Sequence, residues 1–280
     1  MKTSRGFKLF QEKFILEAVE KFELGEAKSV STPIDISCLE NFQSKKLEDK
    51  RLYQSLIGTV NYVTCCTRPD IAFAVNLLAR RLQEPTYADL KRAKRILIYL
   101  RDTRKKGINI EKEDTSKKIR LKTFVDASLG NGTQRKSIFG YIVLIGENIV
   151  AYKSKKQELV AQSTCEAEYV ALAYSIKETL WIERLLSEIG IGFKTSIVFC
   201  DNAGAVKIAH KQIATGRTRH LDLRLQMIKD LVTKGLIKVQ HIRSDLNVAD
   251  IFTKPLGRIL FSKIADAIMD KKALSSKEEC

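Results

Sequence analysis

Acidic residues stand at several points where they could together hold metal ions. Asp126 and Asp201 each end a predicted strand, and Asp250 begins a predicted short helix after the last strand. A glutamate near the start of a predicted long helix, Glu166 or Glu168, would complete a group of four carboxylates. Four carboxylates in one place cannot all stay ionised without cations. Mg²⁺ prefers oxygen ligands and suits a phosphate substrate, so the residues predict a magnesium site for phosphodiester chemistry.

The stretch STCEAEYVAL leaves open which glutamate belongs to this site. Successive residues of a helix are about 100° apart, so Glu166 and Glu168 point to nearly opposite sides. Only one of them can face the other acids. With two Mg²⁺ ions about 4 Å apart, such a group would activate water and stabilise the leaving oxygen of a phosphodiester.

Each acid also has a purely structural interpretation. Asp201, followed by Asn202, could cap the next helix. Asn247 and Asp250 resemble a capping box with aspartate in place of glutamate. Asp126 could be a turn residue. Taken singly, each aspartate favours the structural role, but their shared position at one predicted crevice favours a metal site.

The elements that must position these acids form the second part of the chain. Alternating segments at 117–128, 139–145 and 148–156 predict three strands, the last two joined by a turn at Gly146. A helix, a strand, two helices, a strand and a short helix follow. This order predicts an α/β fold with a mixed five-stranded sheet. The fourth strand returns parallel to the first on its other edge, and ligand sites open where the connections diverge.

The first part of the chain predicts a mainly helical segment with a basic surface. Apolar residues recur at helical spacing over 6–24 and 86–107, and two helices between them end near Pro69 and Pro85. We therefore predict a helical segment at 1–110, a linker at 111–117, an α/β domain at 118–262 and an unstructured tail at 263–280.

Composition narrows the class of protein. The chain of 280 residues has 49 Lys and Arg against 33 Asp and Glu, a net charge of +16 that favours a polyanionic partner over a merely solvated basic surface. Its six cysteines form no CxxC pair and its three histidines lie far from them, which argues against zinc. No long apolar run or signal-type segment is present, so we expect a soluble intracellular protein without a membrane partner.

Six motifs resemble the C-terminal part of a copia-type retrotransposon Pol polyprotein, where the end of the reverse transcriptase precedes ribonuclease H. They occur in the family's order over about 5–262: YQSLIGTVNYVTCCTRPDIAFAVNLLAR, RKSIFGYI, STCEAEYVAL, CDNAGAV, RTRHLDLR and VADIFTKPL. The resemblance implies a ribonuclease H-like fold after a thumb or connection segment. It implies cleavage of the RNA strand of RNA/DNA hybrids with two Mg²⁺ ions, or Mn²⁺. The remaining Pol domains would be partners, in a cytoplasmic virus-like particle or in the nucleus.

The resemblance also assigns the acids. The family's glutamate stands in a Glu-aromatic/aliphatic-x-Ala pattern, which here selects Glu168 as the ligand. Glu166 then becomes a helix-start charge, favourable near the positive end of the helix dipole. Asp126, Asp201 and Asp250 match the family's acids of the first strand, the fourth strand and the last helix.

Basic residues near these motifs are weaker candidates. Ribonucleases H often use a histidine near the last acid to help the product leave, and His241 is the nearest candidate; it could instead be a packed strand residue. His220 lies in the motif RTRHLDLR with Arg217, Arg219 and Arg224. These four residues could contact phosphates or could serve packing.

Departures from the family pattern leave two functions open. The family usually has Asp-Ala-Asp after the first strand, whereas this chain has Asp126-Ala127-Ser128 and a loop one residue shorter. No adjacent aspartate pair occurs, so the chain has no polymerase active site. The two hypotheses are an active ribonuclease H and a catalytically inactive nucleic-acid-binding remnant of a degraded element. An integrase-type nuclease fits the motif order poorly.

Overall fold

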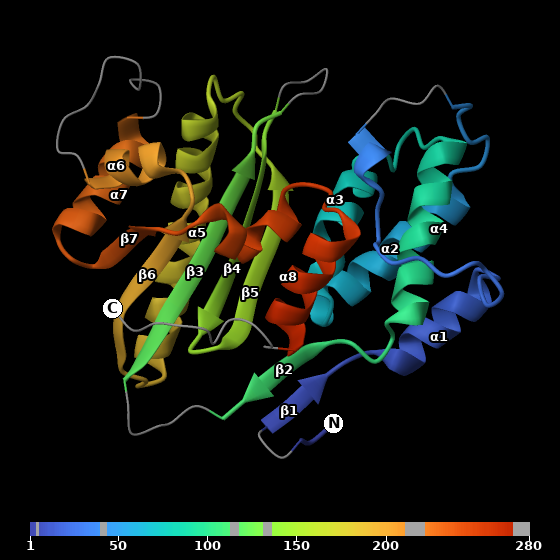
Figure 1. Ribbon diagram of the computed structural model, residues 1–280, viewed down its shortest axis with the longest axis horizontal. Helices are drawn as coiled ribbons and strands as arrows, with labels where there is room; N and C mark the ends of the chain where they lie inside the picture. The colour runs from blue at the N-terminus through green and yellow to red at the C-terminus, as the bar shows by residue number, and fades with distance from the viewer. Residues whose placement is uncertain (4–5, 40–43, 113–117, 131–135, 211–221, 271–280) are drawn as a thin grey trace. The chain divides into compact units, whose positions relative to one another are not determined.

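The chain divides into two compact units, shown in Figure 1. The computed structural model describes residues 1–3, 6–39, 44–112, 118–130, 136–210 and 222–270. Unit 1 comprises residues 1–111 with 254–280, and unit 2 comprises residues 112–253. Unit 2 carries all four predicted acids.

Unit 2 is built on the predicted five-stranded sheet. Its strands are β3 (Ile119–Ser128), β4 (Ile138–Ile145), β5 (Asn148–Lys156), β6 (Phe193–Cys200) and β7 (Ile237–His241). Their order across the sheet is β5-β4-β3-β6-β7. The pairs β3–β4 and β4–β5 are antiparallel, while β3–β6 and β6–β7 are parallel. The predicted fold class, a mixed sheet whose fourth strand lies parallel to the first on its other edge, is confirmed.

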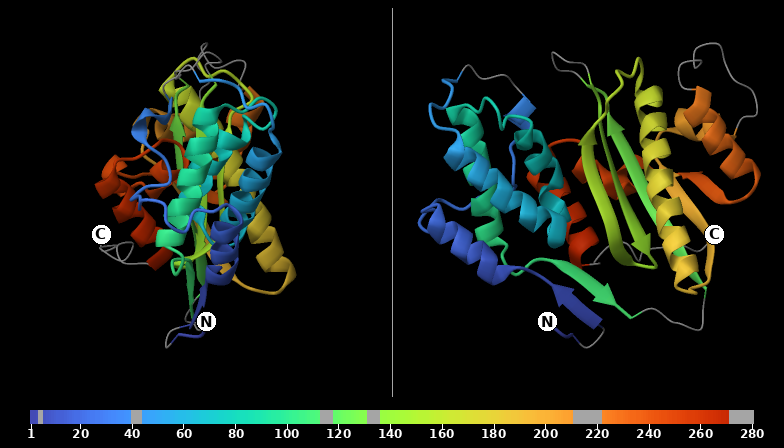
Figure 2. Two further views of the ribbon diagram at one scale, coloured as in Figure 1. Left: turned by 90° about the vertical axis from the view of Figure 1, so that its right-hand side faces the viewer. Right: turned by 180° about the vertical axis from the view of Figure 1, so that it is seen from behind.

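The helices of unit 2 cover both faces of this sheet. They are α5 (Thr164–Glu188), α6 (Ala203–His210), α7 (Asp222–Thr233), η4 (Ser244–Leu246) and η5 (Val248–Phe252). In Figure 1, α5 lies behind the sheet and the short helix η5 crosses in front of β3 and β4; Figure 2 shows α5 from the other side. Val125 and Phe139 pack with α5 residues in the core of unit 2. On the opposite face, Phe124 stacks on Phe199 with ring centroids 5.0 Å apart.

Two glycines end or turn elements as their sequence positions predict. Gly146, between β4 and β5, has φ of +58°, a backbone conformation that residues other than glycine rarely adopt. Gly190, two residues after the end of α5, has φ of +76°. Gly146 thus fixes the turn of the β4–β5 hairpin, and Gly190 fixes where α5 ends. Both therefore help to position the neighbouring residues along the sheet.

Close packing of η5 on the sheet depends on a third glycine. Gly140 of β4 pairs with Asp126 of β3. A Cβ at Gly140 would clash with the Cβ of Phe252 in η5. Asn247, at the start of η5, donates its side-chain N–H to the main-chain oxygen of Val125 at 3.0 Å. The missing side chain and this hydrogen bond together hold η5 against the end of β3.

Unit 1 is mainly helical, as predicted, with one added pair of short strands. Its elements are β1 (Gly6–Leu9), α1 (Glu12–Lys21), η1 (Ile36–Leu39), α2 (Arg51–Cys66), η2 (Pro69–Ile71), α3 (Ala72–Ala79), α4 (Tyr87–Asp102), β2 (Ile108–Glu111) and α8 (Arg258–Asp270). The strands β1 and β2 pair antiparallel. Residues 6–9, predicted to be helical, therefore form a strand.

A buried ion pair links two elements of the helical part of unit 1. The Arg68 side chain makes two hydrogen bonds with Asp70, at 2.9 and 2.7 Å, and both side chains are fully buried. The Tyr99 hydroxyl donates to the same carboxylate at 2.7 Å. Because all three polar groups are paired, this network links η2 to α4 without leaving a charge uncompensated.

The predicted tail differs from the structure. Residues 263–270 form the second part of α8, in which Ile264 and Ile268 are buried and which belongs to unit 1. Its Phe261 ring meets Tyr99 edge-on, with centroids 5.6 Å apart. The predicted domain boundary at residue 262 thus lies inside a helix, and unit 2 ends at Thr253. Residues 271–280 and the linker residues 113–117 lie outside the described residues.

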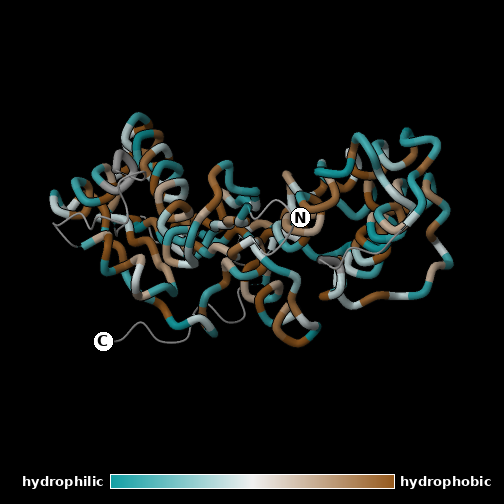
Figure 3. Tube along the Cα trace, turned by 90° about the horizontal axis from the view of Figure 1, so that it is seen from above, coloured by the Kyte–Doolittle hydropathy of each residue, from teal (hydrophilic) through white to brown (hydrophobic). Residues whose placement is uncertain are grey.

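The hydropathy pattern along the chain agrees with helices and strands that each bury one face. Hydrophobic and hydrophilic residues alternate along the trace of both units, as expected for elements with one buried face (Figure 3). In the described part of the chain, no helix combines the length and the apolar character that a membrane crossing requires.

Candidate metal centre

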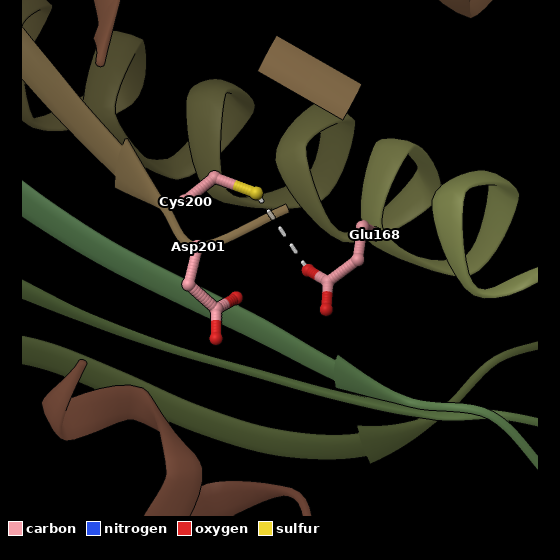
Figure 4. A group of neighbouring side chains, drawn as sticks. All are labelled: Glu168, Cys200 and Asp201. Carbon is pink, nitrogen blue, oxygen red and sulfur yellow. Dashed lines mark hydrogen bonds between the residues drawn. The ribbon is translucent and has the colours of Figure 1, made fainter. Parts of the chain in front are cut away.

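The four predicted acids lie in one cluster of unit 2. One carboxylate oxygen from each of Asp126, Asp201 and Asp250 lies within 4.8 Å of the other two. A second group, in which Glu168 and Cys200 join Asp201, satisfies the same limit. Asp201 belongs to both groups, so it links Glu168 to the three aspartates. Figure 4 shows Glu168 reaching from α5 toward Cys200 and Asp201 at the end of β6.

Three of these acids are buried and the fourth is partly exposed. Asp126, Glu168 and Asp250 are 3%, 5% and 7% exposed, whereas Asp201 is half-buried. Asp126 lies within β3 and pairs across the ladder with Gly140, so it is not a turn residue. A ligand would therefore reach the cluster past Asp201.

The pKa of Glu168 shows how unfavourable four charges are here. Burial, and then the charges of Asp126 and Asp201, raise its pKa to about 9. A main-chain hydrogen bond from Ala127 and the Cys200 thiol act in the opposite direction. Without a cation, Glu168 is thus protonated at neutral pH. Carboxylate oxygens are the ligands that Mg²⁺ and Mn²⁺ prefer, and the bound ions would restore the charged form, so the residues fit such ions.

The two neighbouring glutamates have separate surroundings. The Glu166 carboxylate accepts a hydrogen bond from the main-chain N–H of Gln162 at 2.8 Å. Its own N–H donates to the Ser163 hydroxyl at 3.2 Å, so Ser163 caps α5. Glu166 therefore occupies the helix-start position predicted for it, whereas Glu168 joins the acid cluster.

The capping roles considered for two aspartates are filled by asparagines. The Asn202 side chain accepts from the N–H of Ala205 at 3.0 Å, at the start of α6. The Asn247 side chain accepts from the N–H of Ala249 at 3.1 Å, at the start of η5. The carboxylates of Asp201 and Asp250 instead meet at the cluster.

Two side chains that contact the acids were not predicted. The Thr253 hydroxyl, which is buried, donates to the Asp126 carboxylate. The Cys200 thiol lies 3.8 Å from a Glu168 oxygen and donates to it. Their positions in sequence carried a signal, because Cys200 directly precedes Asp201 and Thr253 follows Asp250 by three residues, but neither residue type suggested a role at a metal site.

The predicted basic residues are only partly described. His241, the last residue of β7, is exposed, and its Nε2 lies 3.1 Å from the main-chain oxygen of Asp201. It thus stands beside the cluster, and its exposure does not support the packed alternative. Arg217, Arg219 and His220 lie outside the described residues, as does the side chain of Arg224 in α7. The loop after Asp126 is described only up to residue 130.

The sheet order and the acid cluster at the ends of β3 and β6 define a ribonuclease H-like domain. Over about 93% of its length, the chain matches a segment of the Pol polyproteins of copia-type retrotransposons. It is 35% identical over 268 residues, 93% of its length, to the retrovirus-related Pol polyprotein from transposon TNT 1-94 of Nicotiana tabacum. It is also 35% identical over 94% of its length to that from transposon RE1 of Arabidopsis thaliana. The Transposon Ty1-NL2 Gag-Pol polyprotein of Saccharomyces cerevisiae is 28% identical over 90% of the chain.

The chain spans only 20%, 18% and 15% of these three relatives' lengths. No protein-family model matches it. Among solved structures, RNase H1 from Halobacterium salinarum aligns with 48% of this chain and 94% of its own, at 17% identity and a TM-score of 0.33. The PFV RNase H domain aligns with 56% of this chain and 96% of its own, at 15% identity and a TM-score of 0.36.

Proposed function

We propose that unit 2 hydrolyses the RNA strand of RNA/DNA hybrids as the ribonuclease H of a retrotransposon Pol polyprotein. The observation that supports this most directly is the convergence of Asp126, Asp201 and Asp250 within 4.8 Å, joined through Asp201 to Glu168. The RNA/DNA hybrid is the proposed substrate because the surrounding motifs resemble those of copia-type ribonucleases H. The absence of an adjacent aspartate pair in the sequence gives no support to polymerase activity.

Asp126, Glu168, Asp201 and Asp250 would hold two Mg²⁺ ions, or Mn²⁺. When bound, these ions supply an activated water and stabilise the leaving oxygen of the phosphodiester. The chain's own residues orient the ligands. Thr253 donates to Asp126, which fixes one oxygen of that carboxylate. Ala127 and Cys200 hydrogen-bond to Glu168 and so turn its carboxylate toward Asp201.

The half-exposed Asp201 gives the face from which a phosphodiester would enter. His241 lies on this face, and its contact with the Asp201 main-chain oxygen keeps the imidazole close to the acids. We propose that His241 assists product release there. Arg217, Arg219, His220 and Arg224 stay candidates for phosphate contacts.

The test is cleavage of an end-labelled RNA/DNA hybrid by the full chain, in Mg²⁺ and in EDTA. We expect cutting of the RNA strand alone, and only with the metal. Asp201→Asn removes one ligand charge and should abolish cutting while hybrid binding stays intact or tightens, because less negative charge faces the phosphates. The matched control is Asp245→Asn, since Asp245 is an exposed aspartate that pairs with Arg243 instead; it should cut normally.

The second candidate is a nucleic-acid-binding remnant without catalysis. It is favoured by one departure, the loop after Asp126, which is one residue shorter than in the family pattern. Hybrid binding by the unaltered chain with no Mg²⁺-dependent cutting would contradict the proposed activity and support the remnant. Cutting that persists in Asp201→Asn would contradict the proposed site.

A further inference from the structure

A small basic pocket opens on unit 2 between α5 and the edge strand β5. Lys153 and Lys155 from β5 and Lys177 from α5 line it, together with the rings of Phe139 and Tyr174. Its volume is about 180 Å³. We call these five residues the lysine pocket. That volume is below the roughly 300–1,000 Å³ of a pocket for a whole small molecule, so a phosphate or a sugar is the size of group that fits.

The pocket carries positive charge that the protein does not neutralise. Among the described residues, Lys153 and Lys177 have no ion-pair partner, while Lys155 pairs with Glu158 at 3.3 Å. One acid, Glu178, also lines the pocket, where it accepts a hydrogen bond from the Tyr141 hydroxyl at 3.0 Å. Three lysines against this single lining carboxylate favour an anionic group.

Stacked rings give the pocket an apolar floor. Phe139 and Tyr174 lie parallel, with ring centroids 4.6 Å apart and an interplanar angle of 10°. Phe139 is buried in the sheet and Tyr174 is half-buried on α5. Lysine stems can lie along such apolar surface while their ammonium groups stay at the mouth. This arrangement suits a charged backbone that also presents sugar faces.

The pocket lies close to the metal centre both across the sheet and along α5. Across the sheet, Lys155 pairs with Phe139 and Phe139 with Ala127, the residue after Asp126. Strands are about 4.8 Å apart, so Lys155 is roughly 10 Å from the end of β3. Along α5, Tyr174 follows Glu168 by six residues, which is about 9 Å at 1.5 Å per residue. Along the axis of a duplex one strand carries a charge every ~3.4 Å, so this distance corresponds to at most about three phosphates.

We propose that the lysine pocket binds the sugar–phosphate backbone of one strand of the hybrid, within about three nucleotides of the scissile bond. The inference rests on the proposed function for its substrate. The pocket anchors the duplex and takes no part in bond cleavage. Its lysines therefore contribute to hybrid affinity, whereas the acids contribute to the chemical step.

The experiment measures binding of a fluorescent RNA/DNA hybrid to the full chain in EDTA, so that no cutting occurs, at several salt concentrations. In the double variant Lys153→Ala/Lys177→Ala we expect affinity to fall about five- to tenfold. The slope of log affinity against log salt should become shallower by roughly 1–2, because two phosphate contacts are lost. Lys153→Arg/Lys177→Arg keeps both charges and should bind like the unaltered chain.

The matched control is Lys194→Ala/Lys238→Ala, which removes two exposed lysines from β6 and β7, toward the edge of the sheet opposite β5. It should leave the slope close to that of the unaltered chain. A second readout comes from Trp181, the chain's one tryptophan, which is 59% exposed and one helical turn beyond Lys177. Its fluorescence should change when hybrid binds, and the change should disappear in Lys153→Ala/Lys177→Ala.

The outcomes separate this inference from the proposed function. If the pocket variant alone loses affinity and slope but the unaltered chain never cuts, the pocket stands and the activity fails. If the chain cuts and the pocket variant binds as before, the activity stands and the pocket inference is overturned. A loss equal to the control's, or no hybrid binding by the unaltered chain, also overturns it.

Discussion

At the scale of single residues, two carboxylates only two positions apart have different roles. Glu166 is tied to the main chain at the start of α5, whereas Glu168 is buried beside Asp126 and Asp201. The difference follows from helical geometry, since the two side chains leave the helix about 200° apart. Substituting each in turn tests which of them the site uses.

We expect Glu168→Gln to reduce hybrid cleavage by at least a hundredfold, because it removes a ligand charge. Glu166→Gln should change the rate less than threefold, because its amide oxygen can still accept from the N–H of Gln162. Initial rates at saturating Mg²⁺ measure both. The assignment of Glu168 is wrong if Glu166→Gln is the inactive variant. Circular dichroism would confirm that each variant is folded.

The raised pKa of Glu168 predicts a stability that depends on pH when metal is absent. Burial and two neighbouring acids raise it to about 9 from an ordinary 4.5, so the folded state binds this proton more tightly than the unfolded state. The stabilisation is complete below about pH 4.5 and is lost as pH rises toward 9. Between pH 6 and 9 in EDTA, the free energy of unfolding should fall by up to about 4 kcal/mol from this group.

Urea unfolding of the unaltered chain and of Glu168→Gln, each at pH 6 and pH 9, isolates this contribution. Glu168→Gln should lose less stability over the interval, because its amide does not titrate. Added Mg²⁺ should reduce the loss in the unaltered chain, since bound cations favour the charged carboxylate. Equal losses of stability in both proteins, with no effect of Mg²⁺, would contradict the raised pKa of Glu168.

At the scale of elements, the site depends on how closely η5 approaches the sheet. Asp250 is carried by this five-residue helix, which packs on β4 where Gly140 has no side chain. Asn247 anchors its start to β3. The last acid is therefore positioned by a missing methyl group and one buried amide.

Gly140→Ala should push η5 away from the sheet, because the new Cβ would overlap the Cβ of Phe252. Overpacking of this kind costs about 1–3 kcal/mol of stability. We expect hybrid cleavage to fall more than tenfold, through displacement of Asp250, with little change in hybrid binding. The control is Gly192→Ala, since a Cβ there meets nothing within 4 Å. Full activity in Gly140→Ala would show that η5 tolerates the shift.

The same scale shows what sequence patterns could reveal. Alternation predicted β3, and acids at strand ends predicted the cluster, because both are local signals that topology brings together. The sequence wrongly predicted helix at the four-residue strand β1, since Phe7 and Leu9 offer too short an alternation to distinguish the period of a strand from that of a helix. Cys200 and Thr253 stand close in sequence to Asp201 and Asp250, but their contacts with Glu168 and Asp126 depend on packing between distant segments.

At the scale of the whole molecule, unit 1 is assembled from both ends of the described chain. Besides the contact between Phe261 and Tyr99, Lys106 pairs with Asp266 at 2.6 Å and Lys8 with Asp270 at 3.6 Å. Unit 2 is inserted between β2 and α8. Loss of the last helix should therefore affect the unit that comes first in the sequence.

A chain ending at Thr253 should keep a folded unit 2 but destabilise unit 1 by several kcal/mol, because the apolar side chains of α8 no longer cover it. Hydrogen exchange followed by mass spectrometry would locate the change, with faster exchange expected in α4 and β2. A chain ending at Asp270, which keeps all of α8, is the control. Uniformly faster exchange in β3 and β6 would contradict the independence of unit 2.

The insertion also fixes an order of events during synthesis. A ribosome must make all of residues 112–253 before α8 emerges. At roughly 5–20 residues per second, this takes on the order of ten to thirty seconds. During that interval Tyr99 lacks its contact with Phe261 of α8, although unit 2 can already fold. Unit 2 is therefore completely synthesised before unit 1, and we expect chaperones to have a defined period in which to protect unit 1.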